Sequence, residues 1–199
     1  MMAEGYAVNQ AAKRVIKDVF VPGITAQEVK DIYDKQASYY DEMLQNSNFR
    51  APAITLEEVL RRVPPEKRGQ TRVLDVAAGT GWVGRELHRE GFRFINAVEP
   101  SEGMIKKLRE SGVYTNDFME FIGTGHSTVP KDTYDLVTIS SGMGEGHIPV
   151  SGLDDLVQVA KKGECERDCF FTVISSFSKG RFHSQYVCFD RYQWLLLPL

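Results

Sequence analysis

Residues 72–84 have the sequence Arg-Val-Leu-Asp-Val-Ala-Ala-Gly-Thr-Gly-Trp-Val-Gly, and this stretch decides the fold. Its first five residues, 72–76, form a short, mostly apolar run that is typical of a buried parallel strand. Small residues follow at 77–81, and the amphipathic run at 82–90 predicts a helix. A strand that ends on glycines and continues as a helix brings backbone and free N–H groups close to a ligand. The stretch therefore predicts a cradle for a nucleotide-type cofactor and leaves open which cofactor binds.

The composition of the chain is that of an ordinary globular protein. Its 199 residues are 42% apolar and 26% charged, which suits one α/β domain with an N-terminal extension. The net charge is −3 and no basic block stands out, so we expect no obligate nucleic-acid partner. The N-terminus lacks the pattern of a signal peptide, and no apolar run approaches the roughly 18 residues of a membrane span. We expect neither feature.

The cysteines are few and confined to the last part of the chain, at Cys165, Cys169 and Cys188. This usage favours a reducing compartment over a disulfide scaffold, so we expect a cytoplasmic protein, with the nucleus as an alternative. Cys165 and Cys169 have no partner pair at metal-ligand spacing, and we expect no metal site.

The N-terminal part is predicted to be helical. Apolar residues at helical spacing predict a helix over 10–20, and a second helix from about Thr25 to Leu44 opens with a capping box of Thr25 and Glu28. We expect residues 1–45 to form a helical cap over the domain that follows.

The second of these helices carries the motif Tyr-Asp-x-x-Ala-x-x-Tyr-Asp at residues 33–41. Its tyrosines, Tyr33 and Tyr40, are seven positions apart and therefore share one helix face. Two interpretations stay open. The tyrosines pack into the core, or they form a lid over a cofactor.

A third helix is predicted over 51–63, with a capping box formed by Thr55 and Glu58. From residue 50 onward we expect the α/β domain, which extends over 50–175 and is followed by an atypical tail at 176–199.

Strands and helices alternate along this domain, which predicts a doubly wound, mostly parallel sheet. Ligands in such sheets bind beyond the carboxyl ends of the strands, where Gly79 and Glu99 would meet. The further strands are expected at 94–98, 115–122, 134–140 and 170–174, and the further helices at 101–111 and 151–161.

The residues near the cradle fit more than one cofactor. Glu99 can accept hydrogen bonds from both ribose hydroxyls of an adenosine, whether in NAD or in S-adenosylmethionine. Gly79-x-Gly81-x-x-Gly84 even satisfies the dinucleotide fingerprint. Asp75 favours the sulfonium cofactor, because a carboxylate there could order the loop or meet the amino end of a zwitterionic ligand. Beside a pyrophosphate its charge would be unfavourable.

Three segments together resemble the class I S-adenosylmethionine-dependent methyltransferases over about residues 30–175. They are Asp-x-Ala-x-Gly-Thr-Gly at 75–81, Glu-Pro-Ser-x-x-Met at 99–104 and Tyr-Asp-Leu-Val at 134–137. The motif at 33–41 and the loop at 144–149 resemble one branch, the methyltransferase-like proteins of the Williams–Beuren syndrome region type.

The resemblance implies a Rossmann-like class I fold and methyl transfer by in-line displacement, which converts S-adenosylmethionine to S-adenosylhomocysteine. The methyl acceptor, a small molecule or a protein group, cannot be identified from the sequence, and neither can the oligomeric state. The alternatives are a non-catalytic or truncated relative that binds the cofactor or serves in an assembly and, more distantly, an NAD-dependent oxidoreductase.

The resemblance also implies a cofactor site. Asp75 to Gly81 would surround the methionine part, Glu99 would bind the ribose, and Tyr33 and Tyr40 would cover the cofactor. One departure is Ala77, where many relatives carry glycine. The full set is Tyr33, Tyr40, Asp75, Ala77, Gly79, Thr80, Gly81, Glu99, Pro100, Ser101, Met104, Glu120, Phe121, Ser140 and Ser141.

His147 is the candidate general base, because it follows the fourth strand, where acceptors often approach in this fold. The alternative is that His147 only hydrogen-bonds the backbone of its own loop.

The C-terminal part departs from the resemblance. The residues after Ile174 leave little room for the helix and antiparallel hairpin of a full class I sheet, and the apolar end resembles a strand without its partner. We therefore expect an incomplete C-terminal part from a truncated or alternative form, in which residues 164–199 are foreign to the fold.

Overall fold

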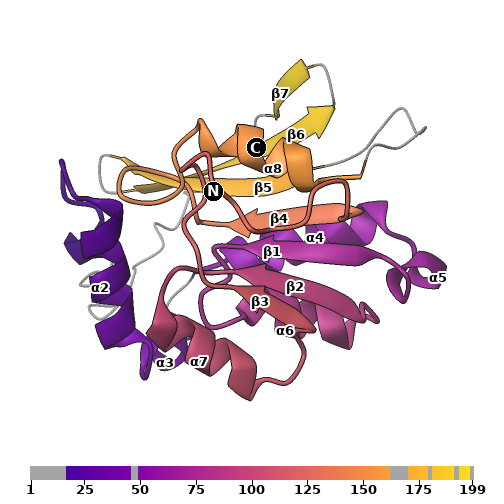
Figure 1. Ribbon diagram of the computed structural model, residues 1–199, viewed down its shortest axis with the longest axis horizontal. Helices are drawn as coiled ribbons and strands as arrows, with labels where there is room; N and C mark the ends of the chain where they lie inside the picture. The colour runs from indigo at the N-terminus through magenta and orange to yellow at the C-terminus, as the bar shows by residue number, and fades with distance from the viewer. Residues whose placement is uncertain (1–16, 46–48, 162–169, 179–180, 191–192, 198–199) are drawn as a thin grey trace, which may run out of the picture.

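The structure, a computed structural model, describes residues 17–45, 49–161, 170–178, 181–190 and 193–197, with side chains as far as residue 161. Its strands form one sheet in the order β3-β2-β1-β4-β5-β6-β7 (Figure 1). Strands β1 to β5 run parallel, and β6 and β7 are antiparallel additions beside β5. The expected doubly wound, mostly parallel α/β sheet of the Rossmann-like class I type is confirmed.

The elements have the following bounds. The helices are α2 (Ala26–Gln36), α3 (Tyr40–Gln45), α4 (Ala51–Arg62), α5 (Pro65–Arg68), α6 (Trp82–Arg89), α7 (Glu102–Glu110) and α8 (Gly152–Val159). The strands are β1 (Arg72–Val76), β2 (Phe94–Val98), β3 (Asn116–Phe118), β4 (Leu136–Ser140), β5 (Phe170–Ser178), β6 (Arg181–Asp190) and β7 (Gln193–Leu197).

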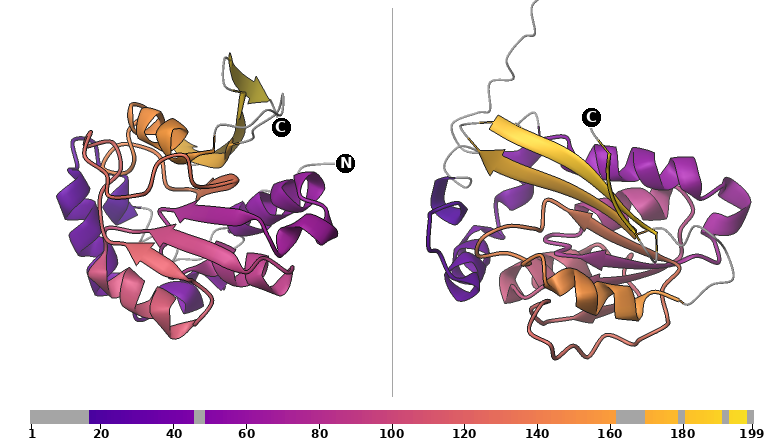
Figure 2. Two further views of the ribbon diagram at one scale, coloured as in Figure 1. Left: turned by 45° about the vertical axis from the view of Figure 1, so that its right-hand side comes forward. Right: turned by 90° about the horizontal axis from the view of Figure 1, so that it is seen from above.

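Both faces of the sheet are buried, which explains why the central strands are apolar along their length. On one face Val73 and Ile95 pack with Leu87 of α6 and Val59 of α4. On the other face lies a second cluster that includes α8, and Figure 2 shows α4 and α8 on opposite sides of the sheet. Because the helices cover both faces, the carboxyl ends of the strands remain the place for a ligand.

The N-terminal cap differs from the prediction in one respect. The capping box is confirmed, since the Glu28 N–H donates to the Thr25 hydroxyl and the Thr25 N–H donates to the Glu28 carboxylate. The single helix predicted to Leu44 is wrong, because α2 ends at Gln36 and α3 begins at Tyr40. Of the helix predicted at 10–20, only residues 17–20 lie within the described residues, and 17–19 are helical.

The second predicted capping box is also wrong. Helix α4 begins at Ala51, and Thr55 lies inside it, fully buried, where its hydroxyl donates to the Ala51 carbonyl oxygen at 2.9 Å. The Glu58 carboxylate instead accepts from Arg61 and Arg62 on the following turn. A proline in the first turn begins this helix, where its missing N–H is not needed.

The C-terminal part forms more of the sheet than we expected. Strand β6 pairs antiparallel with β5, and β7 pairs with β6, so the expectation of a strand without a partner is wrong. The strands fit because β5 ends at Ser178 and β6 begins at Arg181, which leaves no room for a helix between them. The third strand is shorter than predicted. In the described part of the chain, no helix is long and apolar enough to cross a membrane.

Candidate cofactor site

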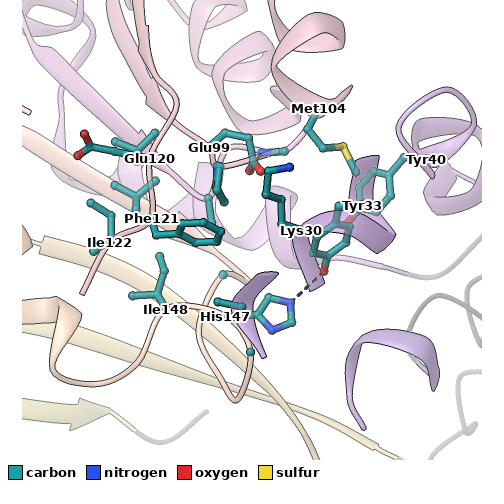
Figure 3. Close-up of a pocket in the computed structure, with 18 residues that line it drawn as sticks. Lys30, Tyr33, Tyr40, Glu99, Met104, Glu120, Phe121, Ile122, His147 and Ile148 are labelled. Atoms are coloured by element: carbon teal, nitrogen blue, oxygen red, sulfur yellow. Dashed lines mark hydrogen bonds between the residues drawn. The ribbon is translucent and has the colours of Figure 1, made fainter. Parts of the chain in front are cut away.

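A pocket opens at the carboxyl ends of β1, β2 and β4, and α2 lies across it (Figure 3). Its empty space is about 700 Å³, open solvent at the mouth included. Ten residues predicted for the site line it: Tyr33, Tyr40, Ala77, Gly79, Glu99, Pro100, Met104, Glu120, Phe121 and His147.

Glu99 is the polar centre of the pocket. It follows β2 and is 6% exposed, and its two carboxylate oxygens each accept one backbone hydrogen bond, from Gly79 N and from Ser101 N, both at 2.9 Å. Burial raises the pKa of Glu99 to about 7, although these two bonds oppose the shift. Each oxygen keeps a further lone pair with which it can accept a hydrogen bond from a ligand.

The loop after β1 has several residues at positive φ, which its small residues allow. Gly79 and Gly81 have φ values of 57° and 84°, in the left-handed region that glycine tolerates. A Cβ atom at Gly79 would meet nothing within 4 Å, so the space above this residue is open. Ala77 also has a positive φ, 52°, which is unfavourable for a residue with a side chain. The departure from glycine at this position therefore introduces local strain.

The third glycine of the apparent dinucleotide fingerprint has a different role. A Cβ atom at Gly84 would lie 2.2 Å from the hydroxyl oxygen of Tyr114, and the Gly84 N–H donates to that oxygen at 3.1 Å. A Cβ atom at Gly81 would lie 2.7 Å from the Tyr114 ring. Both glycines make room for Tyr114. The match to the fingerprint therefore does not require a pyrophosphate.

Asp75 does not line the pocket. Its carboxylate is 1% exposed and accepts from the hydroxyls of Tyr114, at 2.8 Å, and Thr138, at 2.9 Å. Burial raises the pKa of Asp75 to about 6, against these hydrogen bonds. Of the two roles considered for Asp75, the geometry favours ordering of the loop over contact with a ligand. The charge argument against NAD therefore loses its basis.

The other predicted residues outside the lining are Thr80, Gly81, Ser101, Ser140 and Ser141. Thr80 and Ser101 are buried and donate to carboxylates of the N-terminal cap. The Ser140 hydroxyl is buried without a hydrogen-bond partner among the described residues, and Ser141 has a φ of 61°.

His147 lies where the loop after β4 meets α2. Its Nδ1 is 3.0 Å from the Glu145 carbonyl oxygen, which can only accept, so Nδ1 carries the hydrogen. Its Nε2 therefore accepts from the Tyr33 hydroxyl at 3.0 Å, as the dashed line in Figure 3 marks. Burial lowers the pKa of His147. The bond to the loop backbone that we considered as an alternative is present, and the imidazole is paired with a predicted lid tyrosine as well.

Sequence reasoning missed eight lining residues. Lys30 could have been found, because it lies three positions before Tyr33 and shares its helix face. Gly142, Gly146 and Ile148 belong to the loop that carries His147, and its path depends on contacts far apart in the sequence. The complete set is Ala26, Lys30, Val76, Val98, Ile122, Gly142, Gly146 and Ile148.

Two curated relatives are similar to most of this chain. Human methyltransferase-like protein 27 is 29% identical over 160 residues, which are 80% of this chain and 64% of that protein. The demethylmenaquinone methyltransferase of Clavibacter sepedonicus is 31% identical over 141 residues, 68% of this chain and 55% of that protein. The chain therefore spans less than two thirds of the length of either relative.

Solved structures share the fold at low sequence identity. The complex of DhpI with SAM and HEP has a TM-score of 0.53 at 19% identity and covers 77% of this chain and 66% of that one. The cyclase SpnF has a TM-score of 0.55 at 18% identity, and the match covers 76% of this chain and 61% of that one. Proteins of this fold thus include one named for a different reaction, so the fold alone does not assign methyl transfer.

A family match extends beyond these pairwise likenesses. The sequence pattern of the ubiE/COQ5 methyltransferase family matches residues 22–199. This range includes the residues from 164 onward, so the expectation that they are foreign to the fold is not supported. It also includes α2 and α3. The chain therefore belongs to the ubiE/COQ5 methyltransferase family, and its fold is that of the S-adenosylmethionine-dependent methyltransferases.

Proposed function

We propose that this chain is a methyltransferase that binds S-adenosylmethionine in the pocket around Glu99. The observation that carries the proposal is Glu99 itself. It is a buried carboxylate at the end of β2 with one free acceptor position on each oxygen, and it lies beside the open space above Gly79. Two ribose hydroxyls supply the donors that this arrangement lacks. The family match favours a methyl donor over NAD.

The remaining lining residues fit the other parts of this cofactor. Met104, Phe121 and Ile122 supply an apolar surface that would hold the adenine. Ala77 and Gly79 would hold the methionine part. Tyr33 and Tyr40, whose rings pack edge to face with centroids 5.9 Å apart, form the cover. S-adenosylmethionine supplies an activated methyl group, so the main task of the protein is to position the acceptor and exclude water.

We also propose a role for His147 when the acceptor carries a proton that must leave. Its neutral imidazole accepts a hydrogen bond from Tyr33, whose hydroxyl oxygen keeps a free lone pair. An acceptor N–H or O–H can donate to that oxygen. The bound cofactor would supply the methyl group, and its sulfur would retain the electron pair of the broken C–S bond. The acceptor proton passes to Tyr33 as the Tyr33 proton passes to His147.

We also propose the branch of the family and the class of acceptor. The 29% identity to human methyltransferase-like protein 27, over 80% of the chain, supports placement among the methyltransferase-like proteins of the Williams–Beuren syndrome region type. The acceptor proposed is a small molecule or a protein group with a transferable proton. A non-catalytic cofactor-binding relative is the second candidate, because the fold also occurs in a protein named for a different reaction and so does not by itself assign methyl transfer.

Calorimetric titration of the purified chain with S-adenosylhomocysteine and with NAD tests the cofactor. We expect S-adenosylhomocysteine to bind and the Glu99→Ala variant to lose at least about 100-fold in affinity, since two charge-assisted hydrogen bonds disappear. Glu90→Ala, at an exposed residue outside the pocket lining, is the matched control and should bind as the wild type does. Binding of NAD alone, or of neither ligand, would overturn the proposal. A methylation screen of metabolites and peptides then separates an active enzyme from the non-catalytic relative.

A further inference from the structure

The motif at 33–41 contains two aspartates that the proposed function does not use. Asp34 and Asp41 follow the two lid tyrosines, and neither lines the pocket. We propose that these aspartates are positioning residues, each of which fixes one of the two loops that form the cofactor cradle. The inference rests on the proposed function for the identity of the cofactor, and it assigns to the cap a task that is separate from covering the ligand.

Asp41 holds the loop after β1. The Thr80 hydroxyl donates to Asp41 Oδ1 at 2.5 Å, and Arg85 Nη2 donates to Asp41 Oδ2 at 2.8 Å. Arg85 Nη1 also donates to the Thr80 carbonyl oxygen at 2.7 Å, so the three residues form a closed network. Thr80 lies between Gly79 and Gly81, the two glycines with positive φ. The aspartate therefore restrains the part of the cradle that contains these two glycines.

Asp34 holds the loop after β2. Its Oδ1 accepts from the Ser101 hydroxyl at 2.6 Å and from Gly103 N at 3.0 Å, at the start of α7. Its Oδ2 accepts from Lys30 Nζ at 2.7 Å. Burial opposes ionisation of Asp34, but these hydrogen bonds outweigh it and lower the pKa of the carboxyl group. Asp34 is therefore charged at neutral pH.

The two restraints meet at Glu99. Its carboxylate accepts from Gly79 N in the first loop and from Ser101 N in the second. The chain of contacts thus runs from Asp41 through the first loop to Glu99, and from Glu99 through the second loop to Asp34. Displacement of either loop would move a hydrogen bond that orients the Glu99 carboxylate, the group proposed to bind the ribose.

The spacing of the motif fits this arrangement. Its central alanine, Ala37, packs where α2 meets α7, since a Cβ atom at Gly103 would lie 3.1 Å from the Ala37 Cβ atom and 2.8 Å from the Asp34 carbonyl oxygen. The break between Gln36 and Tyr40 then redirects the chain, so that the second aspartate reaches a different loop from the first. An uninterrupted helix would instead place both aspartates on one face, seven positions apart.

The inference predicts that affinity for the cofactor depends on side chains that never touch it. Two substitutions of Thr80 give the sharpest test. Thr80→Val removes the hydroxyl at nearly constant shape and leaves the Asp41–Arg85 ion pair, whereas Thr80→Ser keeps the hydroxyl. We expect S-adenosylhomocysteine to bind Thr80→Val about tenfold more weakly than the wild type, and Thr80→Ser to bind within about threefold of it.

The aspartates are tested in the same titration, with Asp31→Asn as the matched control. Asp31 lies on α2 and is half-exposed. It accepts from Gln27 and lies 3.9 Å from Lys30 Nζ, a much longer contact than the 2.7 Å bond of Lys30 to Asp34. We expect Asp34→Asn and Asp41→Asn each to weaken binding about tenfold or more, and Asp31→Asn to leave it unchanged within about twofold. Thermal unfolding of each variant, measured alongside, establishes that the binding experiment is made on folded protein.

The outcomes separate the two proposals. If the wild type binds S-adenosylhomocysteine but Thr80→Val, Asp34→Asn and Asp41→Asn bind as tightly as Asp31→Asn, the positioning role is refuted and the proposed cofactor stands. The positioning role is equally refuted if Thr80→Ser is as weak as Thr80→Val, because the hydroxyl would then not matter. If the wild type binds no S-adenosylhomocysteine, the proposed function itself fails.

Discussion

The loop after β1, residues 77–81, and the loop after β4, residues 141–149, are neighbours that are built differently. Their strands pair in parallel, with Val76 beside Ile139, and both loops begin with a residue other than glycine at positive φ. The first loop is a short turn into a helix. The second follows a longer path that returns on itself, where Ile148 N donates to the Gly142 carbonyl oxygen.

The difference lies in what holds each loop in place. The first consists of small residues between a strand and a helix, and the Thr80 hydroxyl in it donates to Asp41 of the cap. In the second, the N-terminal segment contacts both Glu145 and His147. Gly23 N donates to the Glu145 carboxylate at 2.8 Å, Tyr33 donates to His147, and Phe20 stacks on His147 with ring centroids 5.4 Å apart. The short turn of the first loop is therefore encoded locally and reinforced by the cap at Thr80, whereas the longer second loop depends on the cap at Glu145 and His147.

The largest expected effect concerns the point where the two loops touch. A Cβ atom at Gly142 would lie 2.4 Å from the Ala77 Cβ atom and 3.0 Å from Ile139. Gly142→Ala should therefore lower the free energy of unfolding by about 1–3 kcal/mol, the usual cost of overpacking. Urea denaturation of the variant and the wild type measures this change.

A double-mutant cycle shows whether the contact itself is responsible. Ala77→Gly removes the methyl group that the new side chain would meet. It also relieves the strain of the positive φ at this position, because glycine tolerates it. We expect Gly142→Ala to cost clearly less in the Ala77→Gly background, with a coupling of about 0.5–3 kcal/mol. If the two changes in the free energy of unfolding are additive, the side chains at 77 and 142 are not in the close contact that the structure shows.

The next effect concerns Glu99, which the first loop contacts through Gly79. Glu99 has a pKa raised to about 7, and the proposed ribose contact needs its ionised form. Protonation therefore competes with the ligand, so affinity for S-adenosylhomocysteine should fall as the pH is lowered below about 7. For one titrating group, the affinity can fall by at most about tenfold per pH unit. Titrations at several pH values measure the fall in affinity. Proton release on binding at pH 7 should appear as a binding enthalpy that depends on the ionisation enthalpy of the buffer.

The onset of this fall distinguishes Glu99 from Asp75, which is also buried. The pKa of Asp75 is raised only to about 6, and Asp75 has no contact with the pocket. In the protein without ligand, both groups have pKa values above those of the unfolded chain, so their burial destabilises the fold at high pH and this penalty is relieved as the pH falls. An affinity that is constant between pH 8 and pH 6 would contradict the assignment of Glu99 as the ribose ligand.

The contrast between the loops also explains how far sequence reasoning reached. The first loop, the Ser101 cap of α7 and the position of Glu99 follow from signals within a few residues, and all three were predicted. The pairing of His147 with Tyr33 joins residues 114 positions apart, and no local pattern contains it. Tyr114 was missed for the same reason, although the glycines that make room for it were recognised. Burial of Asp75 by Tyr114 and Thr138 could not be seen from the apolar run that contains it.

The smallest expected effect tests the second loop. Tyr33→Phe removes the hydroxyl that donates to His147 Nε2 and leaves the half-buried imidazole without this donor. We expect the free energy of unfolding to fall by about 0.5–1.5 kcal/mol, the net value of such a bond, as measured by urea denaturation at pH 7.5. Tyr39→Phe is the matched control, because Tyr39 is 48% exposed and its change should stay within about 0.5 kcal/mol. If the two variants are equally stable, the hydrogen bond does not hold the second loop. The dependence of that loop on the cap would then rest on Glu145 and on packing against Phe20.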